Sequence, residues 1–547
     1  MSGVTDICTA DVAPRHPAFF ATASLFLIAP LCLLGAIIGT QLIVTLGITT
    51  NTSLIGAMAG MALGRLPMAA FARYRSIHLQ NLAQSAISAA TFGAGNALLL
   101  PIGIPFVMGM PELVTPMLIG VTLAMLLDGF LLWCLFDSEI FPSGGAWPPG
   151  VAAAVAIRAG DEGGRKLWVL GGGVLSGAVG QAAFGIPMSA FGVAFIGNIW
   201  ALAMFGVGLL ARAYSTRLFG GDMFASIFPG GDLMKAYLPQ GFMLGAGLVA
   251  LVQVAIHVLR DNSGSPSPGA ARKGPVRLRR ALGLGCLAYV AIAMLIAMLG
   301  ELWTSMPAGL FIAFVLYAAF AALIHELIVG LAAMHAGWLP AFGVAVVTLA
   351  VGILIGFPPA ALTLMVGFTA ATGPAFADMG YDLKAGFILR GNGTDPAFEA
   401  EGRRQQLFAA MFAFVVAAVV VLVSHRYYLA NNMVAPIDKV YAASIKAGAS
   451  ASVAWGLTIW AVPGALLQFA GGPRRQVGIL LATGLLLGGV PAGWAVLVGI
   501  ALRVLWSKTA ARGRVADMEV FAAGVIAGDA LYSFYDMGSR YLNRDVP

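Results

Sequence analysis

The sequence predicts an all-α polytopic integral membrane protein of roughly 12–16 transmembrane helices, in two related halves that contain broken or re-entrant segments. Three observations support this prediction. First, 59% of the 547 residues are hydrophobic and 10% are charged, whereas about a quarter of the residues of a soluble protein are charged. Second, long apolar runs recur along the whole chain. Third, a polar segment divides the chain near its middle.

The apolar runs are long enough, or nearly so, to cross a bilayer core of roughly 30 Å. Examples lie at 20–46, 113–135, 191–210, 241–258, 309–324 and 407–423. Many of the 70 glycines follow small-xxx-small spacing, as in Gly56, Gly60 and Gly64. Because small residues let helix backbones approach closely in lipid, we expect these glycines to serve helix packing rather than chemistry.

The middle of the chain contains its longest polar stretch, at 261–280. It contains the run Ser-Gly-Ser-Pro-Ser-Pro-Gly and ends in basic residues, a composition typical of a flexible linker. We therefore expect an N-terminal transmembrane half at 1–260 and a C-terminal transmembrane half at 281–547, packed against each other.

The charge pattern points to a membrane rather than to nucleic acid. The net charge is +7, but the basic residues fall in short loops between apolar runs, the pattern of cytoplasmic loops in membrane proteins. The four cysteines show no metal or disulfide spacing. We expect membrane lipid as a partner and no nucleic acid, cofactor or metal.

A first polar break at 141–150 interrupts sequence that is otherwise apolar enough to lie in a membrane. Pro142 interrupts helical hydrogen bonding, and Gly144 and Gly145 permit unusual backbone angles. Irregular backbone is tolerated at membrane depth only where protein buries it or it lines a water-filled cavity, and such breaks mark substrate sites in transporters. The alternative is an ordinary loop between two helices.

A second polar break is expected at 378–386, in the other half. Asp382 and Lys384 lie two positions apart there, between apolar flanks. Carboxylates inside a membrane are costly and often mark ion or proton pathways. The alternative is a structural charge pair at the membrane surface.

Other acidic residues offer weaker signals. Asp128 lies deep in an apolar run and is a proton-relay candidate, against the alternative of a single hydrogen bond to a neighbouring helix. Asp137 and Glu139 precede the first break, and we expect both to be solvated near an interface; the alternative is that they neutralise cations at the mouth of the pathway. His325 and Glu326 do not continue into a His-Glu-x-x-His zinc motif.

Five landmarks in order along the chain together resemble the bacterial and yellow-stripe-like branch of the oligopeptide transporter (OPT) family. They resemble, in turn, the family's Asn-Asn-x-x-Gln-Thr helix, Phe-Pro-Ser-Gly break, Pro-x-Gly-x-Met-x-Gly-Ala-Gly stretch, Asp-Leu-Lys-Thr-Gly motif with two following glutamines, and last helix. The landmarks lie at 80–101, 141–144, 237–247, 382–406 and 524–531.

This resemblance implies a secondary active transporter that imports oligopeptides or metal chelates, usually with protons. It also indicates candidate residues for substrate binding and proton coupling. Substrate contacts are expected from Asn81, Gln84, Pro142, Ser143, Gly144, Gly145, Trp147, Asp382 and Lys384. Proton coupling is expected from Asp382 and Asp529, the latter matching an acidic position of the family, and, on its deep apolar position alone, from Asp128. The chain departs from the family where Gly-Ala-Trp replaces Thr-Ala after Pro-Ser-Gly, which leaves the substrate open.

Two alternatives remain open at this stage. One is a carrier of another small polar solute, such as an amino acid. The other is an intramembrane lipid-modifying enzyme, which would need clustered acids that the sequence does not show. No Walker motif is visible, so we expect an ion gradient rather than ATP as the driving force, and no enzymatic activity. The expected location is the bacterial inner (plasma) membrane, and a homo-oligomer is one open arrangement.

Overall fold

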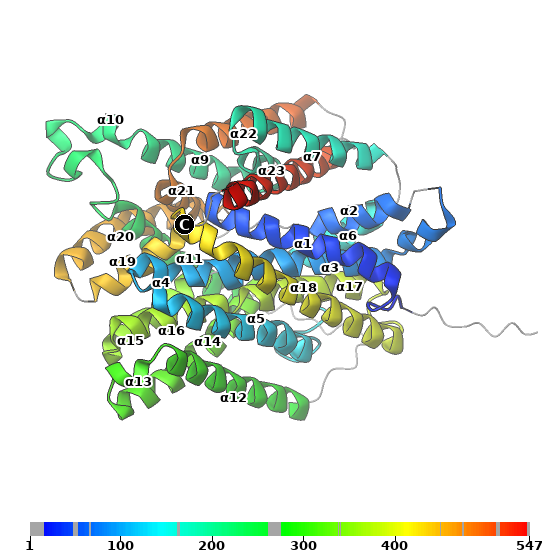
Figure 1. Cartoon of the computed structure of the whole chain (residues 1–547), viewed down its shortest axis with the longest axis horizontal. Helices are drawn as coiled ribbons and strands as arrows, with labels where there is room; N and C mark the ends of the chain where they lie inside the picture. The colour runs from blue at the N-terminus through cyan, green and yellow to red at the C-terminus, as the bar shows by residue number, and fades with distance from the viewer. Residues whose placement is uncertain are drawn as a thin grey trace, which may run out of the picture.

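The structure, a computed structural model, describes most of the chain. The described residues are 16–47, 53–64, 67–160, 165–260, 275–336, 339, 341–448, 450–472, 475–509 and 515–543. Across them the chain is a bundle of helices without a strand, and an isolated bridge joins Phe136 to Phe141. The all-α prediction is confirmed (Figure 1).

The first half supplies eleven α-helices. They are α1 (Thr22–Thr45), α2 (Ser53–Gly64), α3 (Ile77–Phe92), α4 (Leu100–Met108), α5 (Val114–Leu135), α6 (Pro148–Gly160), α7 (Arg165–Phe184), α8 (Met188–Ile196), α9 (Ile199–Ala213), α10 (Ser215–Phe219) and α11 (Leu238–Arg260). A π-helical turn, η2 (Gly93–Leu99), joins α3 to α4 without a loop. Short 3₁₀ turns are η1 (Ala69–Arg75), η3 (Pro111–Leu113), η4 (Asp222–Phe224) and η5 (Pro229–Gly231).

The second half supplies the remaining twelve. They are α12 (Pro275–Leu299), α13 (Leu302–Ser305), α14 (Ala308–Ala336), α15 (Ala341–Ile355), α16 (Pro359–Ala371), α17 (Pro374–Leu389), α18 (Pro396–Ala430), α19 (Pro436–Ala447), α20 (Ala451–Gly471), α21 (Val477–Leu487), α22 (Val490–Thr509) and α23 (Val515–Asn543).

Nine helical segments in the described ranges are long and apolar enough to cross a membrane. They are Thr22–Thr45, Ile77–Met108, Pro111–Leu135, Leu278–Leu299, Ala308–His335, Pro359–Leu389, Pro396–Ala430, Ala451–Gly471 and Val490–Lys508. Further apolar helices of 10–17 residues, such as Ala341–Ile355, are shorter. The chain is therefore an integral membrane protein with several apolar spans.

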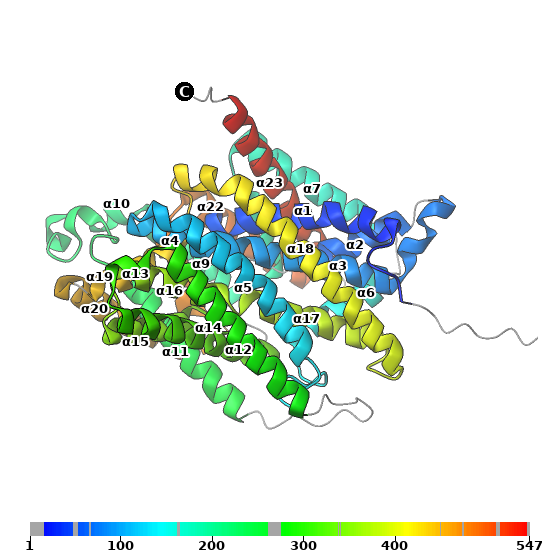
Figure 2. The same ribbon diagram turned by 60° about the horizontal axis from the view of Figure 1, so that its bottom comes forward.

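Helices from the two halves of the sequence interleave. In both views α7 lies along α23 (Figures 1 and 2). The helix α11 packs on α20, and α9 packs on α21. Close approach depends on glycine: a Cβ on Gly177 of α7 would lie 2.1 Å from the carbonyl oxygen of Val525 on α23. This contact supports the expectation that glycines serve packing. A structural repeat relating the halves stays a prediction.

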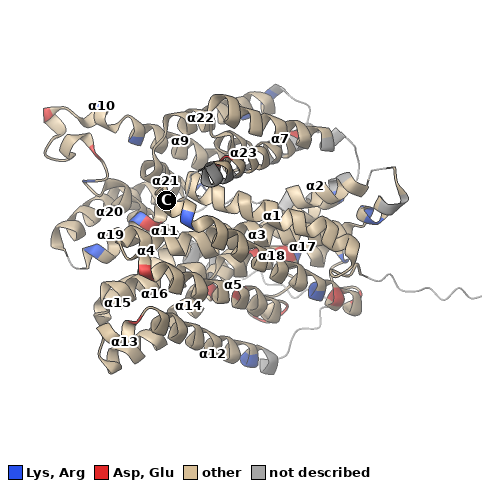
Figure 3. Cartoon of the chain, in the orientation of Figure 1, with Lys and Arg blue, Asp and Glu red and all other residues tan. Residues whose placement is uncertain are grey.

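Most of the expected linker, 261–274, lies outside the described residues. The helix α12 begins at Pro275, so the last part of the segment expected as linker, 275–280, is helical. Proline suits the first position of a helix because its missing N–H is not needed there and its φ is already helical. Figure 3 shows that most of the ribbon carries no charged residue, as a membrane interior requires.

Two breaks in the helices shape the interior. The first runs from Phe136, where α5 ends, to Trp147, just before α6, and the expected break at 141–150 falls largely within it. The second is not at 378–386: that segment is regular helix, inside α17, and the prediction of irregular backbone there is wrong. The chain breaks instead at Thr372 and Gly373, where Gly373 has a φ of +98° that favours glycine.

Candidate functional site

The centre of the candidate site is the acidic face of α17, which packs against α3. Asp378 and Asp382 are spaced i, i+4, so they lie on the same side of the helix, and both side chains are buried. The Ser88 hydroxyl donates to Asp378 Oδ1 at 2.6 Å, and the Gln84 amide donates to Asp382 Oδ1 at 2.5 Å. Neutral donors from α3 therefore hold both carboxyls.

Side-chain amides add further hydrogen bonds to this cluster. Asn81 donates to Gln84 Oε1 at 2.9 Å, which orients the amide that reaches Asp382. Gln406 on α18 donates from Nε2 to the backbone oxygen of Asp382 at 2.7 Å and to Ser85 Oγ at 3.0 Å. The sequence-predicted residues Asn81, Gln84 and Asp382 are thus brought together, with Gln406 as a further member.

A buried ionic chain continues from Gln406 to the first break. Arg390 donates to Gln406 Oε1 at 2.8 Å and forms a bidentate pair with Glu399, at 2.7 and 3.0 Å. Arg403 lies 3.3 Å from Glu399 and 3.7 Å from Asp137. The charge signs alternate along this chain, so each buried charged group has a partner of opposite sign.

The opposite side of α17 faces the first break. The Lys384 ammonium donates to the backbone oxygen of Ser143 at 2.8 Å. The Ser143 hydroxyl donates to Asp137 Oδ1 at 2.7 Å, and Trp147 is anchored by a 2.8 Å bond from its backbone N–H to the carbonyl of Met334. Lys384 and Ser143, both expected from the sequence as substrate contacts, are thus joined by a hydrogen bond, and Trp147 is held at the end of the same break.

Two buried donors on this side lack a described partner. They are the indole Nε1 of Trp147 and the hydroxyl of Tyr381, whose rings meet edge to face at a centroid distance of 6.0 Å. Tyr381 is spaced i, i+3 from both Asp378 and Lys384, so it lies between the acidic face and the Lys384 side of α17. Buried polar groups in native structures are nearly always paired, so these donors mark a place where a ligand group or water would bind.

The remaining residues of the first break differ in exposure. Gly144 is exposed and Pro142 and Gly145 are half-buried. A Cβ on Gly145 would lie 2.7 Å from Met334 Sδ. Glu139 is exposed as expected, but Asp137 is buried, so its expected solvation is wrong. The physical reason is that Arg403 and Ser143 supply the partners that water would otherwise provide.

Asp128 and Asp529 lie apart from this network. Asp128 accepts from the Tyr289 hydroxyl at 2.6 Å and from the Gly373 N–H at 3.1 Å, at the second helix break. Asp529 on α23 accepts from the backbone N–H of Ser189 at 2.9 Å and also from its hydroxyl. Both are buried, but the described contacts do not join Asp529 to α17.

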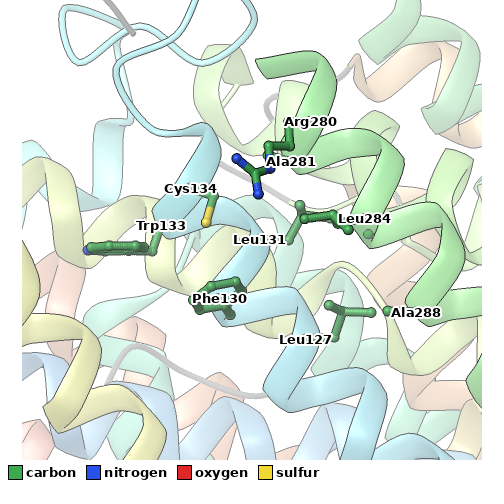
Figure 4. A pocket seen from close by; sticks show the side chains of 10 residues that line it. Leu127, Phe130, Leu131, Trp133, Cys134, Arg280, Ala281, Leu284 and Ala288 are labelled. Carbon is green, nitrogen blue, oxygen red and sulfur yellow. The ribbon is translucent and has the colours of Figure 1, made fainter. Parts of the chain in front are cut away.

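Two described cavities lie away from these acids. One, of about 500 Å³, lies between α5 and α12 and has apolar walls, with the Arg280 guanidinium at the end near Cys134 (Figure 4). A second, of about 550 Å³, lies among α7, α8, α22 and α23. No group of three or more His, Cys, Asp or Glu that could hold a metal occurs among the described residues.

The titratable residue His16 lies outside the spanning segments, near the Arg390 charge. His16 precedes α1, and its ring lies 5.3 Å from that of His78 and 5.4 Å from that of Phe398. Burial lowers its pKa from 6.5 to about 4, and the nearby Arg390 charge acts in the same direction.

Sequence reasoning missed several members of the site. Asp378, Ser88, Gln406 and Tyr381 were not predicted as site residues. A signal for Asp378 was present, because it precedes Asp382 by four positions in an apolar segment and such spacing places two acids on one helix face. No sequence signal connects Tyr381 with Trp147, which meet only in the fold.

The chain is similar to a known protein family over part of its length. A sequence model of a protein family described as "OPT oligopeptide transporter protein" matches residues 272–537, just under half of the chain. The matched part includes α17 and α18, and therefore Asp378, Asp382, Lys384 and Gln406. This similarity is to a family of transporters rather than of enzymes. No curated protein sequence matches the chain.

Proposed function

We propose that this protein is a secondary active transporter that couples proton movement to the import of oligopeptides or metal chelates. The observation that carries the proposal is the acidic face of α17. Asp378 and Asp382 are buried within a membrane-spanning segment and are held by neutral Ser88 and Gln84 rather than by a basic side chain.

The energetics of this face favour proton exchange. An ionised carboxylate in a membrane interior is costly unless a cation, a proton or several donors compensate it. Each carboxyl has one described hydrogen bond, and its second oxygen, Oδ2, is buried without a partner in the described part of the chain. Two such acids one helical turn apart also repel when both are ionised. Protonation removes both costs, so we assign them the role of proton carriers.

The opposite side of α17 supports an anionic substrate group. Trp147 and Tyr381 offer buried donors, and the Lys384 ammonium lies one helical turn from Tyr381. Peptides and carboxylate-rich metal chelates both present carboxylates, which hydrogen-bond well to such donors. One helix would thus hold the substrate beside the proton-carrying acids, because Tyr381 is spaced i, i+3 from Asp378 as well as from Lys384, which gives a physical route for coupling them.

The proposal also includes the family branch to which the chain belongs and the membrane in which it lies. The landmarks at 80–101 and 141–144 lie outside the part matched by the family sequence model, and they supply the Gln84 side chain and the Ser143 backbone carbonyl to the same site. This agreement supports placing the whole chain in the bacterial and yellow-stripe-like branch of the family, in the bacterial plasma membrane. Lipid, protons and the substrate are the proposed partners. A homo-oligomer remains one open arrangement.

The test is uptake by purified protein in proteoliposomes. The substrates would be di- to tetrapeptides, free amino acids, and ferric or nickel chelates, each with a proton gradient, with a proton ionophore, and with a sodium gradient at clamped pH. We expect peptides or chelates to accumulate only under the proton gradient. Accumulation driven by sodium alone would overturn the coupling, and uptake of amino acids alone would favour the alternative carrier function.

A further inference from the structure

The second helix break holds a pair of acids outside the site described above. At Thr372 and Gly373 the chain leaves α16 and enters α17, and the freed N–H of Gly373 donates to Asp128 Oδ2 at 3.1 Å. The Tyr289 hydroxyl donates to the other oxygen of Asp128 at 2.6 Å. Asp128 therefore has a described donor on each carboxyl oxygen.

Glu326 on α14 is the second acid. It is completely buried, it interacts electrostatically with Asp128, and it lies beside the Tyr289 hydroxyl, whose proton goes to Asp128. Neither carboxyl oxygen of Glu326 has a hydrogen-bond partner in the described part of the chain. A buried polar group without a partner requires an explanation such as a bound proton, ion or water.

The groups around Glu326 do not neutralise it. In the adjacent residue, His325, the ring atom Nε2 lies 2.8 Å from the carbonyl oxygen of Ala341. The other ring nitrogen, Nδ1, lies 3.4 Å from Thr372 Oγ1. Because Nε2 must donate to that carbonyl, the ring contacts backbone rather than the carboxylate. No described ion pair places a lysine or arginine on Asp128 or Glu326.

We propose that Asp128 and Glu326 form a second proton site, which holds one exchangeable proton at the break between α16 and α17. Two neighbouring carboxyls in a membrane interior cannot both remain ionised at modest cost. The proton resides on Glu326, because Asp128 already has two donors. On release it returns to water, and Tyr289 keeps its own proton throughout.

The consequence is a link between this proton and the acidic face of α17. Gly373 immediately precedes the first residue of α17, and Asp378 and Asp382 lie further along the same helix. Loss of the proton from Glu326 would leave two charges facing each other at the start of α17 and would favour its displacement. This link rests on the proposed transport function, whereas the proton site itself does not.

The direct test is infrared difference spectroscopy of the purified protein between acidic and alkaline buffer, in water and in heavy water. We expect a protonated-carboxyl component that shifts in heavy water and is lost in Glu326→Gln, while components from Asp378 and Asp382 remain. It should persist in Glu326→Asp, which keeps a carboxyl group, and in the control Glu112→Gln, an exposed acid. An unchanged band in a folded Glu326→Gln protein would overturn the site.

Transport provides the second readout. We expect Glu326→Gln to lose uphill uptake at least tenfold and to retain substrate exchange, which needs no net proton movement. If the spectra change as expected and no wild-type proton coupling is found, the proton site stands and the proposed function fails. If wild type couples protons and Glu326→Gln behaves like Glu112→Gln in both assays, this inference fails alone.

Discussion

The side-chain amide of Gln84 on α3 donates to Asp382 Oδ1 on α17 at 2.5 Å, across 298 positions of sequence. This bond joins the first and second halves of the chain at the acidic face of α17. It also leaves the second carboxyl oxygen of Asp382 without a described partner. The carboxyl is therefore positioned by one bond and free to change its protonation at the other oxygen.

Asp382→Asn should separate coupling from binding. Asparagine keeps the oxygen that accepts from Gln84 and removes the titration. We expect uphill uptake to fall at least about tenfold, equivalent to ~1.4 kcal/mol, with substrate exchange largely retained. The control is Ile388→Leu on the same helix. Equal losses of exchange and uphill uptake would assign Asp382 to substrate binding or folding instead.

Arg390→Met should destabilise the protein strongly. The Arg390 and Glu399 side chains are 0% and 5% exposed, and removing one partner of a buried pair typically costs about 3–5 kcal/mol. The double change Arg390→Met with Glu399→Leu should recover part of the loss, because no unpaired carboxylate remains. Thermal unfolding in detergent measures both. A double variant less stable than the single variant would contradict this account.

The helical structure of α17 shows why the second break was misplaced by sequence reasoning. The polar residues of 378–386 suggested backbone exposed to a cavity. The structure satisfies them through side chains distant in sequence, such as Ser88, 290 positions from Asp378. The true break carries the signal Thr-Gly-Pro at 372–374, where glycine permits the positive φ and proline starts the next helix.

The membrane class was predictable because it follows from composition and run length alone. The first break was also predictable, because prolines and glycines act locally on the backbone. Glu326 was not, since its significance depends on Asp128, which only the fold brings near it. Its neighbour His325 suggested a comparison with a zinc motif, but in the structure the His325 ring hydrogen-bonds to the carbonyl of Ala341.

Gly144 and Gly145 should respond differently to leucine. A side chain on Gly145 would collide with Met334, its Cβ alone lying 2.7 Å from Sδ, so Gly145→Leu should reduce the yield of folded protein. Gly144 is exposed, so Gly144→Leu should fold and still reduce uptake if the break lines the pathway. Size-exclusion profiles and uptake measure the two effects. Wild-type uptake by Gly144→Leu would identify this part of the break as an ordinary loop.

The N-terminal contact at His16 should weaken in acid. Its pKa is about 4 when folded and 6.5 when unfolded. Between these values the unfolded chain binds a proton that the folded chain does not, so stability falls as pH falls through this window. We expect His16→Phe to reduce the decline in melting temperature between pH 6.5 and about pH 4. An identical pH profile in wild type and variant would show that His16 does not contribute.

The donors of Trp147 and Tyr381 should set the preference for a substrate carboxylate. Trp147→Phe and Tyr381→Phe each remove one donor and keep an aromatic ring. A hydrogen bond to a charged group is worth about 1.5–3 kcal/mol, so each variant should raise the KM for uptake roughly tenfold or more. The matched controls are Trp168→Phe and Tyr535→Phe, because those side chains are 84% and 71% exposed.

A comparison of free and C-terminally amidated peptides makes this prediction specific. Wild type should prefer the free carboxylate, and each variant should lose most of that preference, because the amide lacks the charge that the donors stabilise. A general packing defect would lower uptake of both peptides equally and leave the preference intact. That outcome would move substrate binding away from Trp147 and Tyr381 while leaving the proton role of Asp378 and Asp382 untouched.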